Sequence, residues 1–105
     1  VRAIKAESGG TLDMAAIRKM TLVRDVFREA LRLYPPVGYF IRQSAETTTM
    51  RDKNVKAGSM VVVAPWTIHR HREYWDNPDG FDPYRFSKDR LKMPLKDCYM
   101  PFGMG

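Results

Sequence analysis

Cysteine is nearly absent from this sequence of 105 residues, which contains Cys98 and no other. An internal disulfide is therefore excluded, and a single thiol is compatible with a reducing compartment. Long apolar runs are also missing. The longest, Met60 to Trp66, is interrupted by Pro65 and is far shorter than the about 20 residues of a membrane-spanning helix. The sequence thus shows no recognisable membrane segment.

Histidine is scarce as well, and the acids form no metal-binding pattern around it. His69 and His71 are two positions apart, so their side chains diverge on a helix. No cluster of acids or cysteines completes a ligand set beside them. We therefore assign neither histidine a catalytic role.

Basic residues outnumber acidic ones by 18 to 12, which gives a net charge of +6. Such an excess can indicate nucleic acid, an anionic membrane or an acidic protein partner. The basic residues are scattered, however, and the densest stretch, His69 to Arg72, is short. Nucleic-acid binding is therefore disfavoured, although a basic binding module that uses Arg70 and Arg72 stays open as an alternative. The apolar fraction of 44% indicates a folded chain.

The clearest predicted element is a helix that begins at Thr21 and ends before Pro35-Pro36. Proline lacks the amide hydrogen and restrains the residue before it, so a helix stops there. Apolar and charged residues take opposite halves of the helical wheel. The apolar half consists of Leu22, Val23, Val26, Phe27, Ala30, Leu31 and Leu33. Upstream, Gly9-Gly10 follows the end of an earlier helix, and Asp13 caps a short helix through Met20.

The sequence period changes after the two prolines. Val37 to Ala45 predicts a strand, and Thr47 to Met50 is a β-prone segment that leads into a turn. The β-branched run from Ser59 to Ala64 predicts a buried strand, and Thr67 to Tyr74 predicts a short helix. After Trp75 the regular pattern stops while aromatic residues continue, which is unusual in a compact domain. We expect this coil to need a larger body against which to pack, namely more protein, a cofactor, or both.

Glu29 and Arg32 lie three positions apart on the predicted helix, which makes them neighbours. Glu29 falls at the edge of the apolar half, where we expect a half-buried carboxylate that requires a partner. Taken alone, such a pair is usually an ordinary surface ion pair that contributes roughly 0.2–0.5 kcal/mol. Two further segments change this interpretation, namely Phe81-Asp82-Pro83-Tyr84-Arg85-Phe86 and Pro101-Phe102-Gly103-Met104-Gly105.

In this order and spacing, the Glu-x-x-Arg helix, the Pro-Pro pair and the two downstream segments resemble the cytochrome P450 family. The resemblance runs from about Asp13 to Gly105, and the stretch from Val26 to Phe40 is most similar to soluble bacterial members. It implies an α+β fragment of the mainly-α cytochrome P450 fold. The parts expected are the Glu-x-x-Arg helix, a small β-sheet, and an aromatic and proline-rich coil (the meander) that leads to the cysteine loop. Residues 1–105 are accordingly expected to form a single incomplete cytochrome P450 domain.

The resemblance also implies roles for three groups of residues. Glu29, Arg32 and Arg85 are expected to form a buried structural cluster behind the haem, in which two guanidiniums compensate one carboxylate. Tyr84 stands where many members carry a glutamate, a departure that leaves Arg85 in place. Haem contacts are expected from Arg42, on a propionate, and from Phe102, Gly103 and Gly105. The residues expected to line the substrate pocket are Val37, Gly38 and Tyr39.

The haem-ligating cysteine is expected beyond Gly105, so the sequence itself is expected to contain no metal ligand and no catalytic residue. Cys98 precedes Phe102, whereas the family's ligand follows that phenylalanine, and we expect Cys98 to be a packed or surface thiol. The fragment alone is therefore expected to be inactive. His69-Arg70 resembles a common family dipeptide, but the Asp-Pro that usually follows it is replaced by His71-Arg72.

The implied function of the full-length protein is that of a haem-dependent monooxygenase, which inserts one oxygen atom from O2 into an apolar organic substrate. Its electrons would come ultimately from NAD(P)H, through an acidic redox partner such as a ferredoxin or a flavin reductase. This partner is expected on a basic face that carries Lys88, Arg90, Lys92 and Lys96. A monomeric, cytoplasmic protein of the soluble bacterial type is expected. Two alternatives remain, a haem-thiolate peroxygenase that needs no redox partner and a basic nucleic-acid-binding module.

Overall fold

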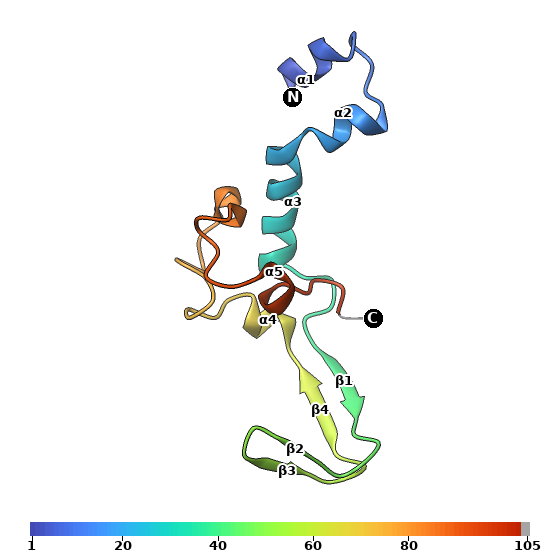
Figure 1. Cartoon of the computed structure of the whole chain (residues 1–105), viewed down its shortest axis with the longest axis vertical. Helices are drawn as coiled ribbons and strands as arrows, with labels where there is room; N and C mark the ends of the chain where they lie inside the picture. The colour runs from blue at the N-terminus through green and yellow to red at the C-terminus, as the bar shows by residue number, and fades with distance from the viewer. Residues whose placement is uncertain (104–105) are drawn as a thin grey trace.

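Two short helices precede the main helix. The computed structural model describes residues 1–103, which form an elongated body with extents of 60 × 27 × 20 Å (Figure 1). Helix α1 spans Arg2–Glu7 and helix α2 spans Met14–Arg18. Asp13 caps α2, because its Oδ1 accepts a hydrogen bond of 2.7 Å from the Ala16 N–H. Within residues 1–103, no helix is both long and apolar enough to cross a membrane.

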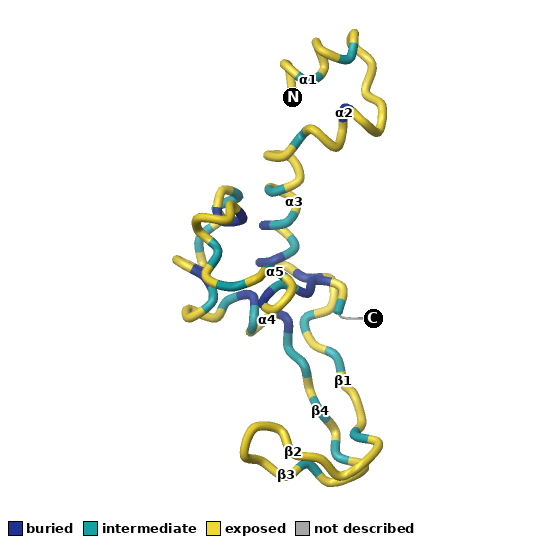
Figure 2. Tube along the Cα trace, viewed as in Figure 1, coloured by how far each residue is buried: buried dark blue, intermediate teal, exposed yellow. Residues whose placement is uncertain are grey.

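Helix α3 spans Thr21–Leu33, and its bounds agree with the sequence pattern. Its burial runs against that pattern, because the charged residues Glu29 and Arg32 are fully buried while Phe27 on the apolar half is 67% exposed. The apolar half also exposes Leu22, Val23 and Val26. The prediction that Glu29 is only half-buried is therefore wrong. The reason is that the coil after α4, which lies beside α3 in Figure 2, contacts Glu29 through Arg85 and Arg32 through the Pro78 carbonyl.

Two antiparallel ribbons extend away from the helices. Strand β1, Phe40–Gln43, pairs with β4, Met60–Val63, so that Phe40 lies opposite Val63. Strand β2, Thr48–Met50, pairs with β3, Lys53–Val55, at the far end of the molecule (Figure 1). The prediction of a buried strand here is wrong, because Val62 in β4 is 60% exposed. A β-branched run favours a strand, but burial depends on what covers its faces.

Helix α4 begins earlier than the sequence pattern suggests. It spans Pro65–Ile68, and Pro65 lies in its first turn, where the missing amide hydrogen leaves no bond unmade. The residues from 69 to 74, which the sequence pattern assigns to a helix, form turns instead.

The hydrophobic core lies in the C-terminal coil. Trp75, Phe86 and Cys98 are buried together, and the Trp75 and Phe86 rings meet edge to face with centroids 6.0 Å apart. Two short helices order the coil, the 3-10 helix η1 at Pro83–Phe86 and helix α5 at Leu95–Cys98. Partly buried side chains complete the core: Tyr74, Leu91, Met93, Leu95 and Tyr99. The coil thus packs on itself and, through η1, on α3. Phe81, Tyr84 and Phe102 nevertheless stay exposed, so the need for a further body against which the coil packs stays a prediction.

Candidate functional site

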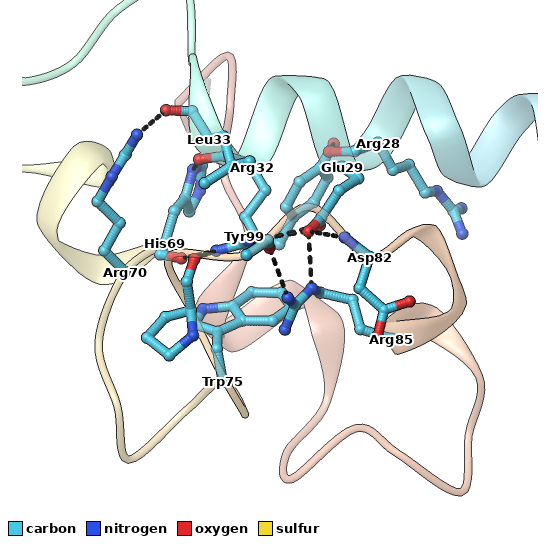
Figure 3. Close-up of polar contacts among 12 residues, drawn as sticks. Arg28, Glu29, Arg32, Leu33, His69, Arg70, Trp75, Asp82, Arg85 and Tyr99 are labelled. Carbon is cyan, nitrogen blue, oxygen red and sulfur yellow. Dashed lines mark hydrogen bonds and ion pairs between the residues drawn. The ribbon is translucent and has the colours of Figure 1, made fainter.

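Glu29 lies at the centre of a buried ion cluster (Figure 3). Its Oε2 lies 2.8 Å from Arg32 Nε, and its Oε1 lies 2.8 Å from both Arg32 Nη2 and Arg85 Nε. The same Oε1 accepts the Asp82 backbone N–H at 2.9 Å. The structure therefore brings Glu29, Arg32 and Arg85 together, as the sequence grouping requires. Their role behind a haem stays a prediction.

Two elements position these side chains. The three-residue spacing on α3 places Glu29 and Arg32 side by side. Arg85 comes from η1, which begins at Pro83 and is capped by the Asp82 carboxylate through a 3.0 Å hydrogen bond from the Tyr84 N–H. Asp82 thus starts η1 with its side chain while its backbone N–H binds Glu29, which fixes the distance between η1 and α3.

Every N–H of the Arg32 guanidinium has an acceptor. Besides the two bonds to Glu29, Nη1 donates to the carbonyls of His69 and Pro78, both at 2.7 Å, and Nη2 donates to that of Gly80 at 3.1 Å. These five bonds use all five N–H groups that an arginine side chain carries. A lysine has three donors on one atom and could not replace this arrangement.

Arg85 binds the same segment of backbone as Arg32. Its Nη1 donates to the Asp76 carbonyl at 2.6 Å, and its Nη2 donates to the carbonyls of Asn77 at 3.1 Å and Gly80 at 2.9 Å. We call residues 76–80 the carbonyl loop, because their backbone oxygens face the two guanidiniums. A Cβ on Gly80 would lie 2.6 Å from Asn77 Nδ2, so the loop is closed tightly around a glycine.

The cluster keeps Glu29 ionised despite its burial. Burial raises the pKa of Glu29, but the hydrogen bond from Arg32, the Asp82 N–H, the charge of Arg32 and the bond from Arg85 outweigh that effect. The net pKa lies below the ordinary value for a glutamate. Throughout residues 1–103, no buried side-chain nitrogen or oxygen lacks a hydrogen-bond partner. The cluster is thus a fully satisfied network, which favours rigidity over proton transfer.

His69 extends the network, although the sequence pattern assigned it no role. It is fully buried, its Nδ1 lies 3.1 Å from the Arg32 carbonyl oxygen, and its Nε2 lies 2.9 Å from the Met100 backbone nitrogen. Burial, with the charges of Arg32 and Arg70, lowers the pKa of His69 to about 4, although the Arg32 carbonyl opposes the shift. The imidazole is therefore neutral near pH 7. The sequence offered one signal, the His69-Arg70 dipeptide, but not the partners.

Arg70 completes the C-terminal end of α3. Its guanidinium donates to the Leu33 carbonyl and lies 3.5 Å from the centroid of the Trp66 ring. The last carbonyls of a helix have no partner within the helix. Here those of Arg32 and Leu33 are bonded by His69 and Arg70, so this dipeptide caps α3 from a distant part of the chain.

The residues expected to contact haem lie in two neighbouring segments. A Cβ on Gly103 would lie 3.7 Å from Phe40 Cε1, so the segment after Met100 reaches the start of β1. The Arg42 guanidinium lies 4.9 Å from the centroid of the Phe40 ring. Phe102 is 71% exposed, and the expected contact Gly105 lies outside the described residues.

These residues fit a haem in their chemistry. An exposed aromatic ring and a glycine backbone suit the face of a macrocycle, and a guanidinium suits a carboxylate at its edge. The expected substrate-lining residues follow α3, where Val37 and Tyr39 are exposed and Gly38 accepts the Trp66 N–H at 3.1 Å. Their contact with a substrate stays a prediction.

Cys98 has the properties of a packed thiol. It is 1% exposed, and burial raises its pKa, with a smaller contribution from Asp97. Its Sγ lies 3.8 Å from the Pro94 carbonyl oxygen. A thiol held neutral in this way is a poor metal ligand. Within residues 1–103, no group of three histidine, cysteine or acidic side chains is arranged to bind a metal ion.

The basic coil residues differ in their surroundings. Arg90 Nη1 lies 2.8 Å from Asp82 Oδ2, and Lys92 Nζ lies 3.0 Å from Asp76 Oδ1. Lys88 and Lys96 are exposed and take part in no ion pair within the described chain. Half of the predicted basic face is therefore already neutralised locally.

Comparisons with known proteins converge on one family. A family model described as "Cytochrome P450" matches residues 2–105. The chain is 36% identical over 91 residues to "Cyclooctatin synthase" of Streptomyces melanosporofaciens, covering 87% of this chain and 20% of that protein. It is 36% identical over 80 residues to "Thromboxane-A synthase" of Rattus norvegicus, covering 76% of this chain and 15% of that protein. The chain thus spans a fifth or less of these relatives' length.

A solved structure gives the same result for the fold. The structure titled "Retinoic acid bound cyanobacterial CYP120A1" superposes with a TM-score of 0.80 at 28% sequence identity. The match covers 90% of this chain and 22% of that one. The chain therefore corresponds to one contiguous part of a larger helical protein.

Proposed function

The chain belongs to the cytochrome P450 family, whose cofactor is haem. We propose that it forms the part of a monooxygenase that lies behind the haem and supports it. The expected fold class, an α+β piece of the mainly-α fold of this family, is confirmed by the structural match. On this proposal, residues 1–105 are one incomplete domain that is inactive by itself.

The observation that carries the proposal is the enclosure of Glu29 by Arg32 and Arg85. All three side chains are at most 3% exposed, and their remaining hydrogen bonds go to backbone atoms of η1, the carbonyl loop and His69. Such an array cannot exchange protons readily, because each group is already paired. The cluster is therefore suited to structural support and not to a role in the reaction.

Haem, when bound, supplies the redox centre at which dioxygen is activated. We propose that Arg42 binds a propionate and that Phe102, Gly103 and Gly105 approach the macrocycle from the cysteine loop. The proximity of Gly103 to Phe40 supports this, because it places the loop next to the strand that carries Arg42. We propose that the ligand is a cysteine that follows Gly105, since Cys98 is buried and neutral.

For the full-length protein we propose insertion of one oxygen atom from O2 into an apolar substrate that contacts Val37, Gly38 and Tyr39. One relative, 37% identical over 82 residues, is named "Cyclooctat-9-en-7-ol 5-monooxygenase", and the solved structure is titled as bound to retinoic acid. Both names support an apolar, ring-bearing or polyene substrate. A peroxygenase is the alternative, and turnover with hydrogen peroxide but not with O2 and a donor would favour it.

We also propose that the protein is a cytoplasmic monomer whose electrons come from NAD(P)H through an acidic ferredoxin or flavin reductase. The exposed Lys88 and Lys96 support an acidic partner. The nucleic-acid alternative would require strongly salt-dependent binding to DNA or RNA by the full-length protein.

The decisive experiment is spectroscopic. Full-length protein is purified, its haem content is measured, and the reduced protein is exposed to carbon monoxide. We expect one haem per chain and the absorption band of a thiolate-ligated haem. A full-length protein that takes up no haem during expression or reconstitution contradicts the proposal.

A further inference from the structure

His69 joins two parts of the chain that are far apart in sequence. A carbonyl oxygen can only accept and a backbone amide can only donate a hydrogen bond. Nδ1 of His69 therefore donates to the Arg32 carbonyl at 3.1 Å, while Nε2 accepts from the Met100 N–H at 2.9 Å. These two bonds fix the neutral Nδ1–H tautomer, and no other protonation state satisfies both partners.

One end of this link is the ion cluster. The Arg32 guanidinium donates to the His69 carbonyl, while the His69 imidazole donates to the Arg32 carbonyl. The two residues thus bind each other through both backbone and side chain. Movement of His69 relative to α3 would break bonds in both directions.

The other end of the link is the segment from Met100 to Gly103. The Met100 carbonyl accepts the Gly103 N–H at 3.1 Å, so Met100 begins a turn in which Gly103 has a φ of +80°. His69 therefore binds the first residue of the turn that places Gly103 against Phe40. The Tyr99 ring stacks on the imidazole with centroids 5.3 Å apart, which restricts the orientation of the imidazole. The Tyr99 hydroxyl donates a hydrogen bond to the Arg28 carbonyl at 3.2 Å.

We propose that His69 is a positioning residue that fixes the segment from Met100 to Gly103 relative to the Glu29 cluster, and through it the loop facing the haem. This inference rests on the proposed function for its haem-related part. The hydrogen bond to Met100 is the specific connection, because the bond to Arg32 alone would cap α3 without reaching the loop.

Two substitutions separate the two bonds in the full-length protein. His69→Asn keeps a donor near the position of Nδ1 but has no atom at the position of Nε2, so it loses the bond to Met100. His69→Phe fills the site and loses both bonds. Cys98→Ala is the matched control, because it removes a buried side chain of the same coil whose hydrogen bond goes to the Pro94 carbonyl and not to His69 or Met100.

The first readout is hydrogen exchange of the Met100 amide, measured with and without haem. We expect the Met100 amide to exchange about tenfold faster in His69→Asn and His69→Phe than in wild type. In both variants, the amides inside α3 should exchange at rates close to wild type. In Cys98→Ala, the Met100 amide should exchange at a rate close to wild type. The second readout is the share of the carbon monoxide complex that has the thiolate-type band. We expect this share to fall in both His69 variants but not in the control.

The outcomes are distinct. Unchanged Met100 exchange in His69→Asn overturns the proposal, and so does faster exchange with an unchanged thiolate-type share. If His69→Phe does not accumulate, His69→Asn alone decides. A wild-type protein without any thiolate-type band contradicts the proposed function instead, and the exchange data then still decide whether His69 holds Met100.

Discussion

Arg85 follows Glu29 by 56 residues, yet its Nε lies 2.8 Å from Glu29 Oε1. Together with the Asp82 N–H bond to the same carboxylate oxygen, this contact holds η1 against α3 across the long segment that contains both ribbons. Both side chains are buried, so neither charge can be compensated by water if its partner is removed. The position of the coil against α3 therefore depends strongly on one carboxylate.

Replacement of Glu29 by alanine is expected to destabilise the full-length protein by about 3–5 kcal/mol, because two buried guanidiniums lose their counter-charge. We expect loss of haem incorporation and not merely slower turnover. Chemical unfolding and the haem-to-protein ratio measure these two effects.

Asp25→Ala on the same helix is the matched control for Glu29→Ala. Asp25 pairs with Arg24 at 3.0 Å and Arg28 at 3.4 Å, but these arginines are partly exposed. We expect a loss of about 1 kcal/mol or less and normal haem content. Normal haem content in purified Glu29→Ala would count against a supporting role for the cluster.

Gly80→Ala is expected to disturb the carbonyl loop, because the added Cβ would lie 2.6 Å from Asn77 Nδ2. The Gly80 carbonyl accepts bonds from both Arg32 and Arg85, so a shift here reaches the cluster. We expect a loss of about 1–3 kcal/mol in unfolding free energy. Gly38→Ala is the control, because its nearest neighbour would be Trp66 Cβ at 3.8 Å, an ordinary contact.

A second substitution tests the cause of that loss. Asn77 has a φ of +44°, a conformation that glycine adopts easily. Asn77→Gly therefore keeps the backbone and removes the colliding amide. We expect the Asn77→Gly/Gly80→Ala double variant to recover much of the stability lost in Gly80→Ala. No recovery would show that the collision with Asn77 is not the cause.

Charge reversal of the basic coil tests electron-donor docking. We expect Lys88→Glu/Lys96→Glu to weaken donor affinity several-fold at low salt, because no acid of the described chain pairs with these lysines. Arg90→Glu is less informative, since it also places a carboxylate beside Asp82. Donor affinity and its salt dependence are measured on the full-length protein. Equal values for wild type and the double variant would remove the coil from the docking surface.

The motifs and the resemblance they carry predicted a buried cluster with these members, whereas the helical wheel alone predicted a half-buried Glu29. Helical spacing and the downstream motif selected Glu29, Arg32 and Arg85, and in the structure each arginine lies 2.8 Å from a Glu29 carboxylate oxygen. The helical wheel then suggested that the apolar half of α3 is the covered one. That inference fails because a wheel describes one helix, whereas the cover here comes from η1 and the carbonyl loop. Their contacts with α3 include an ion pair to Glu29 and hydrogen bonds from Arg32 to backbone carbonyls.

The remaining contacts could not be predicted, because their partners are backbone atoms. The acceptors for Arg32 and Arg85 are carbonyls of the carbonyl loop, and every residue has a carbonyl. The Met100 amide that binds His69 lies 31 residues away and likewise has no side-chain signature. Only the path of the chain, which follows from the whole fold, determines which of these groups meet.

His69 is expected to make stability depend on pH. Its pKa is about 4 in the folded chain, chiefly because of burial, against an ordinary value of 6.5. Between these values the unfolded chain binds a proton that the folded chain excludes, so stability rises with pH in this window. The contribution is complete above pH 6.5 and is lost as the pH falls towards 4. Its size is about 3–4 kcal/mol, from roughly 1.4 kcal/mol for each pKa unit.

The charged and donor groups that face the imidazole act in the same direction as its burial. Arg32 and Arg70 repel a positive charge on the His69 ring, and the Met100 amide can donate only to a neutral ring. We expect urea unfolding of the full-length protein between pH 4 and 6.5 to show a steeper rise in wild type than in His69→Phe, which has no group to titrate at this site. Equal slopes in wild type and His69→Phe would mean that His69 is not held neutral by the fold.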